Sequence, residues 1–140
     1  MDETKFFVVA VSAVIFKQGK VLAMRRSLKK DAGPGLWETL SGRIETGEDP
    51  LEAVKREIQE ECALTVNLDP RPVAAYHSQR GNDEMILIIY RAEHLSGDVI
   101  RSEEHDDHAW LTPDEFAEHS TLKKLVDVVY QIAEMTEIQI

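Results

Sequence analysis

A run of 23 residues between Gly42 and Leu64, GRIETGEDPLEAVKREIQEECAL, constrains this chain more than any other segment. Within it, Glu57, Glu60 and Glu61 are related as i, i+3 and i+4, which places them within an arc of roughly 100° on one face of an α-helix. Acidic neighbours at that spacing repel one another by about 0.2–0.5 kcal/mol per pair. Something must offset the repulsion, and a divalent cation is the simplest candidate because hard cations take oxygen ligands.

The residues around these glutamates predict where the helix begins and which side of it is buried. Asp49 suits the N-cap, Pro50 suits the first helical position, and Glu52 completes a capping box. The helix is therefore expected from Pro50 to about Cys62. Apolar residues recur along it every three or four positions, so that this side should pack on a sheet. These residues are Leu51, Val54, Ile58 and Cys62.

Apolar and β-branched runs separated by polar turns predict several strands in the rest of the chain. Strands are expected at 6–16, 21–25, 71–79, 84–93 and 109–111, with a short extended segment at 37–44; turns at 18–19 and 80–83; and loops at 27–36 and 96–107. Thr112 to Glu115 repeats the capping-box pattern and opens a short helix, and Ser120 or Thr121 is expected to cap the last helix. Strands interleaved with two main helices indicate a compact α/β sheet covered by helices.

Length and charge narrow the function classes. The chain has 140 residues, enough for one domain with a buried core, and residues 1–140 are interpreted as that domain. Its net charge of −10 argues against nucleic-acid binding, for which a basic face is expected. The same charge would repel an anionic substrate unless metal ions reverse the local field.

Cysteine usage and hydropathy bear on the cell compartment. Cys62 is the only cysteine, which excludes an intrachain disulfide and fits a reducing cytoplasm. The apolar run 6–16 is too short to span a membrane and lacks the positively charged flank of a signal peptide. It is therefore interpreted as a buried strand, and the protein is expected to be cytoplasmic without a membrane partner.

The acidic segment resembles the signature of the Nudix hydrolases, in which a glycine, a glutamate and an Arg-Glu-apolar-any-Glu-Glu core stand at fixed spacings. The matching positions are Gly42, Glu48, Arg56, Glu57, Ile58, Glu60, Glu61 and Leu64. Ala63 departs from the pattern by standing where the family has glycine, and Leu40-Ser41-Gly42 replaces the frequent Pro-Gly-Gly approach. If the position of Ala63 requires a positive φ, alanine is strained there by about 1–2 kcal/mol; with ordinary backbone the change should matter little.

The resemblance implies a fold, a reaction and a metal. Nudix hydrolases are α/β/α sandwiches with a mixed sheet, and they hydrolyse a diphosphate linked to another moiety with Mg²⁺ or Mn²⁺. Carried over by position, Glu57, Glu60 and Glu61 are the metal-binding carboxylates, and the carbonyl of Ser41 is a further ligand. Arg56 can lock one glutamate by a bidentate pair and orients the site together with the signature glutamate ahead of the helix.

The general base is left open between two carboxylates. Glu57 is one candidate for accepting a proton from the attacking water. Glu104, followed by Glu103, is the other, because family members often place an extra glutamate in the loop before the matching Trp110. The alternative is that this loop is merely an acidic, solvated segment.

Substrate contacts are expected from basic and aromatic residues ahead of and beyond the signature. Arg25 and Arg26 are candidates for phosphate binding, and only one of them can face the cleft if they lie in a strand. Trp37 and Tyr76 are candidates for stacking on a base, although an aromatic residue in a strand more often belongs to the core. The expected partner is a small molecule containing a nucleoside diphosphate group.

Three alternatives remain open at the level of sequence. The chain could act on ADP-ribose or a nucleotide sugar, or it could be a non-catalytic nucleotide sensor of the same fold. An isopentenyl diphosphate isomerase-like reading rests on the segments 21–27 and 35–37, but the intact acidic signature and the lack of a matching cysteine disfavour it. A homodimer is also possible, since symmetric dimers are common among soluble proteins.

Overall fold

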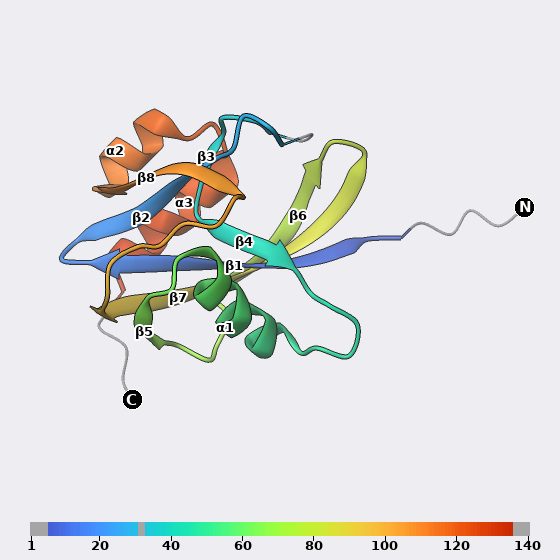
Figure 1. Ribbon diagram of the computed structural model, residues 1–140, viewed down its shortest axis with the longest axis horizontal. Coiled ribbons are helices and arrows are strands. Elements are labelled where there is room, and N and C mark those ends of the chain that lie inside the picture. The colour runs from blue at the N-terminus through green and yellow to red at the C-terminus, as the bar shows by residue number, and fades with distance from the viewer. Residues whose placement is uncertain (1–5, 31–32, 136–140) are drawn as a thin grey trace, which may run out of the picture.

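The computed structural model describes residues 6–30 and 33–135, and these form one mixed sheet with three helices (Figure 1). The ends of the proposed 1–140 domain, 1–5 and 136–140, lie outside the described residues. The elements are β1 (Val8–Lys17), β2 (Lys20–Arg26), β3 (Trp37–Glu38), β4 (Leu40–Arg43), α1 (Pro50–Glu61), β5 (Thr65–Leu68), β6 (Ala74–Arg80), β7 (Asp83–Ser96), β8 (His105–Leu111), α2 (Pro113–His119) and α3 (Lys123–Ala133).

The centre of the sheet is a parallel pair, β1 and β7, in which Val8 lies opposite Met85 and Phe16 opposite Glu93. The main strand order is β3-β2-β1-β7-β5, while β4 also pairs with β1, β6 with β7, and β8 with β2. These other pairings are all antiparallel. The sheet is therefore mixed, as expected, and β4 delivers the start of the acidic segment to the middle of it.

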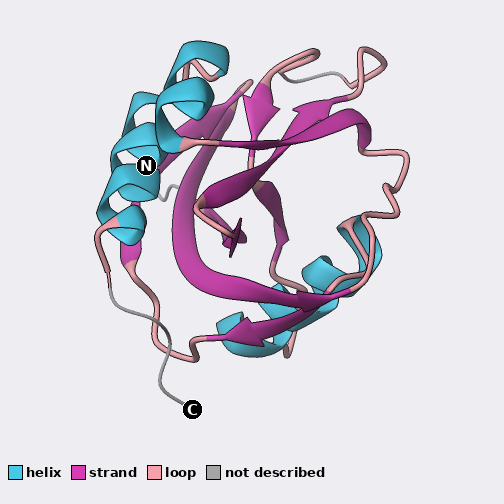
Figure 2. Cartoon of the chain, turned by 90° about the vertical axis from the view of Figure 1, so that its left-hand side faces the viewer, coloured by secondary structure: helices cyan, strands magenta, loops and turns pink. Residues whose placement is uncertain are grey.

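Helices cover both faces of the curved sheet (Figure 2). Alternate residues of β1 face opposite sides: Val14 packs into a core with α2 and α3, whereas Val11 and Ile15 pack into a second core with α1. This alternation follows from the two-residue period of a strand. The α/β/α sandwich expected from the sequence is confirmed.

The helix that carries the acidic signature begins and packs as predicted. Glu52 Oε1 accepts a hydrogen bond from the Asp49 backbone N–H at 3.2 Å, which forms part of the capping box. On its apolar side, Val54, Ile58 and Cys62 are at most 2% exposed and contact the sheet. Because the apolar side is fixed on the sheet, the neighbouring glutamates are held beside β4.

Several strand boundaries differ from the sequence predictions. The structure adds β5, which was not predicted, and it divides the expected extended segment 37–44 into β3 and β4. The expected strand 71–79 begins only at Ala74. The expected loop 96–107 shrinks to 97–104, because β7 continues to Ser96 and β8 begins at His105. Pairing with β2 extends β8, since Arg25 lies opposite Asp107 and backbone pairing overrides the polar side chains.

The predicted cap of the last helix was wrong. Leu122 is the N-cap of α3, and no side chain caps its first turn. The Ser120 hydroxyl instead donates a hydrogen bond to the Trp37 carbonyl at 2.8 Å and accepts one from the Leu122 N–H at 3.3 Å. Ser120 therefore ties the segment before α3 to β3. The box at Thr112 is confirmed, since Thr112 Oγ1 accepts a hydrogen bond from the N–H of Glu115.

Within the described ranges, no helix combines the length and apolarity needed to cross a membrane.

Ala63 occupies a left-handed backbone conformation just after α1, with φ +57°. Its N–H donates to the carbonyl of Ile58 at 2.9 Å, which closes the C-terminal end of the helix. Such a position favours glycine, because a Cβ there crowds the following carbonyl. Of the two backbone conformations considered for Ala63 from the sequence, the structure has the one with positive φ, in which alanine is strained.

We expect Ala63→Gly to stabilise the protein by about 1 kcal/mol, because relief of the strain exceeds the entropy that glycine adds to the unfolded chain. The melting temperature followed by circular dichroism should rise by about 3 °C. Ala133→Gly, at the exposed last residue of α3, is the matched control and should leave stability unchanged or lower it. A melting temperature that does not rise in the Ala63 variant would contradict the strain.

Candidate active site

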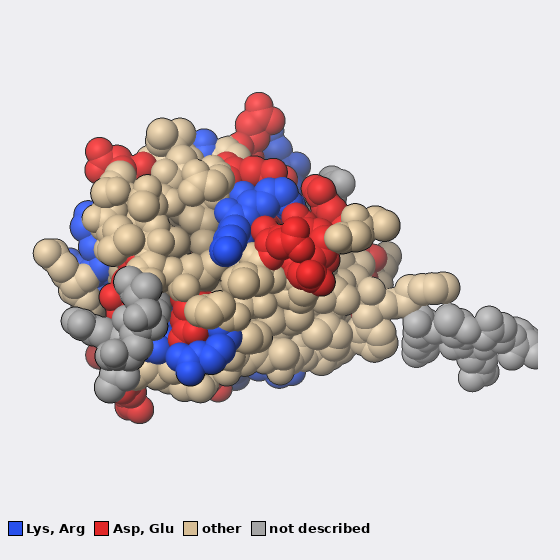
Figure 3. Space-filling view, turned by 90° about the horizontal axis from the view of Figure 1, so that it is seen from below, with Lys and Arg blue, Asp and Glu red and all other residues tan. Residues whose placement is uncertain are grey.

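A cavity of about 700 Å³ lies where α1 meets β4, and acidic and basic side chains share its walls. Figure 3 shows such groups lying side by side on the face seen from below. The lining residues are Ala10, Arg26, Lys29, Lys30, Ser41, Gly42, Arg43, Glu45, Arg56, Glu57, Glu60, Glu61, Arg80, Asp83, Met85 and Glu104. The structure thus places the three glutamates expected to bind metal, Ser41 and Glu104 around one space.

The signature glycine is required by a close approach between backbone and carboxylate. A Cβ built on Gly42 would lie 2.0 Å from Glu57 Oε1 and 2.1 Å from Glu57 Cδ. Gly42 does not have a positive φ, so conformational freedom is not the reason for a glycine here. The missing side chain lets β4 receive the Glu57 carboxylate, which is 6% exposed.

Arg56 lies at the centre of the acidic cluster. It makes a bidentate pair with Glu48, with Nε–Oε2 at 2.8 Å and Nη2–Oε1 at 2.9 Å. Its Nη1 donates to Glu57 Oε1 at 2.8 Å and to Glu60 Oε2 at 3.1 Å, and its Nη2 donates to the Arg43 carbonyl at 3.0 Å. The guanidinium therefore offsets part of the repulsion among the glutamates, and the bidentate pair predicted for Arg56 is formed with Glu48.

Burial dominates the electrostatics of Glu57. It raises the pKa of this carboxyl from 4.5 to about 7, against the opposing effect of Arg56, with Glu61 and Glu60 adding smaller upward effects. By contrast, the hydrogen bonds from Arg56 lower the pKa of Glu48 to about 2. The Glu57 carboxylate is thus destabilised by its surroundings, whereas the Glu48 carboxylate is stabilised by them.

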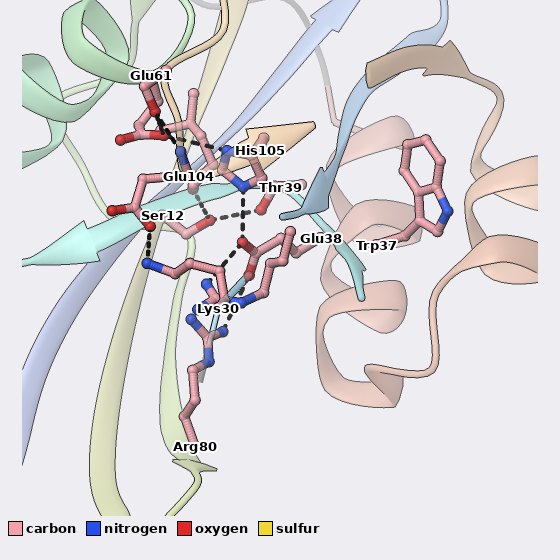
Figure 4. A network of polar contacts seen from close by, with 12 residues as sticks. Ser12, Lys30, Trp37, Glu38, Thr39, Glu61, Arg80, Glu104 and His105 are labelled. Atoms are coloured by element: carbon pink, nitrogen blue, oxygen red, sulfur yellow. Dashed lines mark hydrogen bonds and ion pairs between the residues drawn. The ribbon is translucent and has the colours of Figure 1, made fainter. Parts of the chain in front are cut away.

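Glu61 belongs to a buried network that crosses the sheet (Figure 4). Its Oε2 lies 3.2 Å from His105 Nδ1, and His105 Nε2 lies 2.9 Å from Glu38 Oε2. Glu38, 2% exposed, is further paired with Arg26 at 3.3 Å and with Arg80 at 3.1 Å. Burial lowers the pKa of His105, but Glu38 and Glu61 together outweigh it and raise this pKa to about 9. The buried carboxylates are therefore compensated by three cationic groups.

Glu104 reaches the same cavity from a different part of the chain, the segment just before β8. Its carboxylate pairs with the Lys30 ammonium, which lowers the pKa of Glu104. Its backbone carbonyl accepts a hydrogen bond from the Ser27 N–H at 2.9 Å. The side chain is 47% exposed, so Glu104 is an ionised, accessible carboxylate at neutral pH.

A second cavity of about 490 Å³ shares Ser41 and Arg80 with the first. Its other lining residues include Tyr76, which also packs against the core, polar residues of β6, and leucines. Lys124 Nζ lies 5.6 Å from the centre of the Tyr76 ring and donates to the His77 carbonyl at 3.0 Å. The lining residues are Ser12, Gly33, Leu36, Glu38, Thr39, Ser41, Tyr76, His77, Ser78, Gln79, Arg80, Gly81, Leu87, Thr121, Leu122, Lys123, Lys124 and Leu125.

The four predicted substrate contacts separate in the structure. Arg26 lines the first cavity and Tyr76 the second. Arg25 points elsewhere, because its Nε pairs with Asp106 at 2.7 Å. Trp37 is turned away from the polar network toward the helices (Figure 4), and its ring meets His119 edge-on at 5.5 Å. Trp37 packs against the core and, among the described residues, it lines neither of these two cavities.

The carboxylates do not converge on a single point, as the ligands of a bound metal ion would. In the part of the chain that the structure describes, no group of three His, Cys, Asp or Glu side chains is arranged to hold a metal ion. The reason is that Glu57 and Glu60 turn toward Arg56 whereas Glu61 turns toward His105 and Ser102. The residues nevertheless fit a hard divalent cation, because their donor atoms are oxygens around one cavity. In addition, the Glu57 carboxylate lies against the backbone of Gly42, and its raised pKa shows that the anion lacks sufficient compensating charge.

Two residues of this site were missed by the sequence analysis. Glu38 was part of an unassigned extended segment, and Arg80 was assigned to a turn. A weak signal existed for Glu38, since a carboxylate in a short apolar segment requires a buried partner. The partners of Arg80 come from distant strands, which no local pattern indicates.

Comparison with known proteins adds an independent finding. The profile of the NUDIX domain matches residues 6–131. The chain is 33% identical over 113 residues to nucleoside triphosphatase NudI of Klebsiella pneumoniae, covering 72% of this chain and 79% of that protein. It is 28% identical over 105 residues to CTP pyrophosphohydrolase of Escherichia coli, covering 75% and 76%. A MutT protein structure from Methanosarcina mazei shares the fold with a TM-score of 0.83 at 22% identity, covering 96% of this chain and 100% of that chain.

Proposed function

Because this chain belongs to the NUDIX family of hydrolases, which act on phosphoric anhydride bonds, we propose that it is a divalent-metal-dependent pyrophosphohydrolase of nucleoside triphosphates. The observation that carries the proposal is the pair of neighbouring cavities that share Ser41 and Arg80 as lining residues. One holds the acidic and basic groups suited to metal and phosphates. The other offers the Tyr76 ring and leucines suited to a base.

Glu57, Glu60 and Glu61 are the residues that would hold Mg²⁺ or Mn²⁺, with the Ser41 carbonyl as a further ligand. The bound metal would neutralise phosphate charge, polarise phosphorus and lower the pKa of a bound water. Arg56 keeps Glu57 and Glu60 at the cavity through its fork of hydrogen bonds, and Gly42 leaves room for the carboxylate. These two residues act by positioning the ligands.

The cationic side of the cavity binds the phosphates in this proposal. Lys29, Lys30 and Arg26 reach the cavity from β2 and the segment that follows it. Water attacks one phosphorus of the anhydride, and the bond from that phosphorus to the bridging oxygen breaks. A nucleoside triphosphate then yields a nucleoside monophosphate and pyrophosphate, and one proton of the water must be accepted.

Glu104 is assigned as that proton acceptor. It faces the same cavity, is accessible and is ionised at neutral pH because Lys30 stabilises its anion. Glu57 is less suited to the role, because its carboxylate is held between Gly42 and Arg56.

A hydrolysis panel tests the proposal. Canonical and oxidised nucleoside triphosphates, nucleoside diphosphates, dinucleoside polyphosphates, ADP-ribose and nucleotide sugars are incubated with Mg²⁺ or Mn²⁺, and products are identified by chromatography. We expect preference for a nucleoside triphosphate, release of pyrophosphate, and loss of activity in EDTA that added metal restores. Preference for ADP-ribose or a nucleotide sugar would contradict the substrate class, and tight binding without turnover would contradict catalysis.

A further inference from the structure

We propose that His105 is a positioning residue, which fixes the Glu61 carboxylate so that a single oxygen, Oε1, is presented to a metal ion. The inference rests on the proposed function, since it takes Glu61 as a metal ligand. It concerns a histidine outside the acidic signature, contributed by β8.

His105 is 4% exposed and lies between two carboxylates. Its Nε2 is 2.9 Å from Glu38 Oε2, and its Nδ1 is 3.2 Å from Glu61 Oε2 (Figure 4). The imidazole ring is rigid and planar, so contacts at both nitrogens fix how the two carboxylates lie relative to each other. Only the Nε2 contact has hydrogen-bond geometry, whereas Nδ1 is buried with no hydrogen-bond partner among the described residues and lies at ion-pair distance from Glu61 Oε2.

The contacts of Glu61 converge on one of its two oxygens. The Ser102 hydroxyl donates to Glu61 Oε2 at 2.8 Å, and His105 approaches the same atom. Among the residues that the structure describes, no hydrogen bond to Glu61 Oε1 is found. Partners that hold Oε2 from two directions set the carboxylate plane and leave Oε1 free for a ligand.

The far end of the histidine is itself held in place. Glu38 is 2% exposed and accepts hydrogen bonds from Arg26 at 3.3 Å and from Arg80 at 3.1 Å. These arginines come from β2 and β6, on different parts of the sheet. The position of His105 is therefore fixed by residues of β2, β3 and β6, none of which carries a signature residue. Through His105, these residues also help to fix the position of the Glu61 carboxylate.

A competing role for His105 predicts the opposite result. If the histidine only supplied positive charge, its removal would leave Glu61 more negative and tighten metal binding. If it positions the carboxylate, its removal loosens metal binding, as loss of a residue that orients a metal ligand typically costs about 10–100-fold in affinity. The sign of the change therefore distinguishes the two roles.

The test measures binding of Mn²⁺ alone, by electron paramagnetic resonance of the free ion without nucleotide. We expect His105→Gln to bind Mn²⁺ more weakly, with a Kd at least about 10-fold higher than that of the native protein. His108→Gln is the matched control: it lies in the same strand and contacts Arg101 at 2.7 Å, so its Kd should stay within about twofold. Ser102→Ala removes the other partner of Oε2 and should weaken binding by about 3–10-fold.

Each outcome is decisive. An unchanged or tighter Kd in a folded His105→Gln protein would overturn the positioning role while leaving the proposed function intact. If that variant does not fold by circular dichroism, Ser102→Ala decides alone: weaker binding supports the inference and unchanged binding overturns it. Failure of the native protein to bind Mn²⁺ would overturn the proposed metal dependence together with this inference.

Discussion

Replacing Glu57 with glutamine is expected to abolish hydrolysis and, at the same time, to stabilise the metal-free protein. Loss of the buried carboxylate should reduce kcat/KM by roughly 10³-fold or more, because several kcal/mol of charge stabilisation depend on the ligand set. Since the pKa of Glu57 is raised from 4.5 to about 7, the folded protein binds more protons than the unfolded chain between these values, and native stability falls as pH rises through them. Glutamine removes that cost.

The gain should be roughly 1–3 kcal/mol at pH 8 and should largely disappear near pH 5, where Glu57 is protonated in the folded state. Urea unfolding in EDTA at the two pH values measures it. Glu60→Gln is the matched control, because the Glu60 side chain is 53% exposed and its removal should change stability by no more than about 0.5 kcal/mol. A Glu57 variant that is less stable than the native protein at pH 8 would show that the Arg56 pair outweighs the burial of the charge.

Gly42→Ala is the second substitution with a large expected effect, although it adds a single methyl group. A Cβ at Gly42 would lie 2.0 Å from Glu57 Oε1, so the Glu57 carboxylate would have to move away from the backbone of β4. We expect Mn²⁺ affinity and kcat/KM to fall by at least about 100-fold, and stability to fall by about 1–3 kcal/mol. Isothermal titration with Mn²⁺ and urea unfolding provide the two measurements.

A double-mutant cycle identifies the cause. In a Glu57→Ala background the obstructing carboxylate is absent, so adding Gly42→Ala should cost less than about 0.5 kcal/mol of stability. A similar cost in both backgrounds would mean that the methyl group disturbs β4 itself rather than Glu57.

The acidic helix and its packing were predictable because they depend on local rules. The spacing of Leu51, Val54, Ile58 and Cys62 fixes which side of the helix meets the sheet, and Asp49 with Glu52 fixes where it begins. The hairpin turn at Gln18 and Gly19 is equally local, since both residues have positive φ as a two-residue turn requires. The signature then led to the family.

What the sequence did not reveal depends on distant pairing. The strand β8 extends to His105 only because β2 pairs with it, and β5 was hidden in an ordinary polar stretch. The network around Glu38 joins residues 67 positions apart in the chain. The pairing of Arg56 with a glutamate was predicted from the signature, but its further contacts were not, because the direction of its side chain follows from packing between α1 and β4.

The shared wall between the two cavities limits how such an enzyme can change its substrate. Ser41 and Arg80 line both spaces, so under the proposed function a substitution at either one would alter base recognition and phosphate chemistry together. The far wall of the second cavity, 76–79 of β6 and 121–125 at the start of α3, lines only that cavity. New selectivity can therefore be engineered, or can evolve, at that wall while the acidic helix stays unchanged.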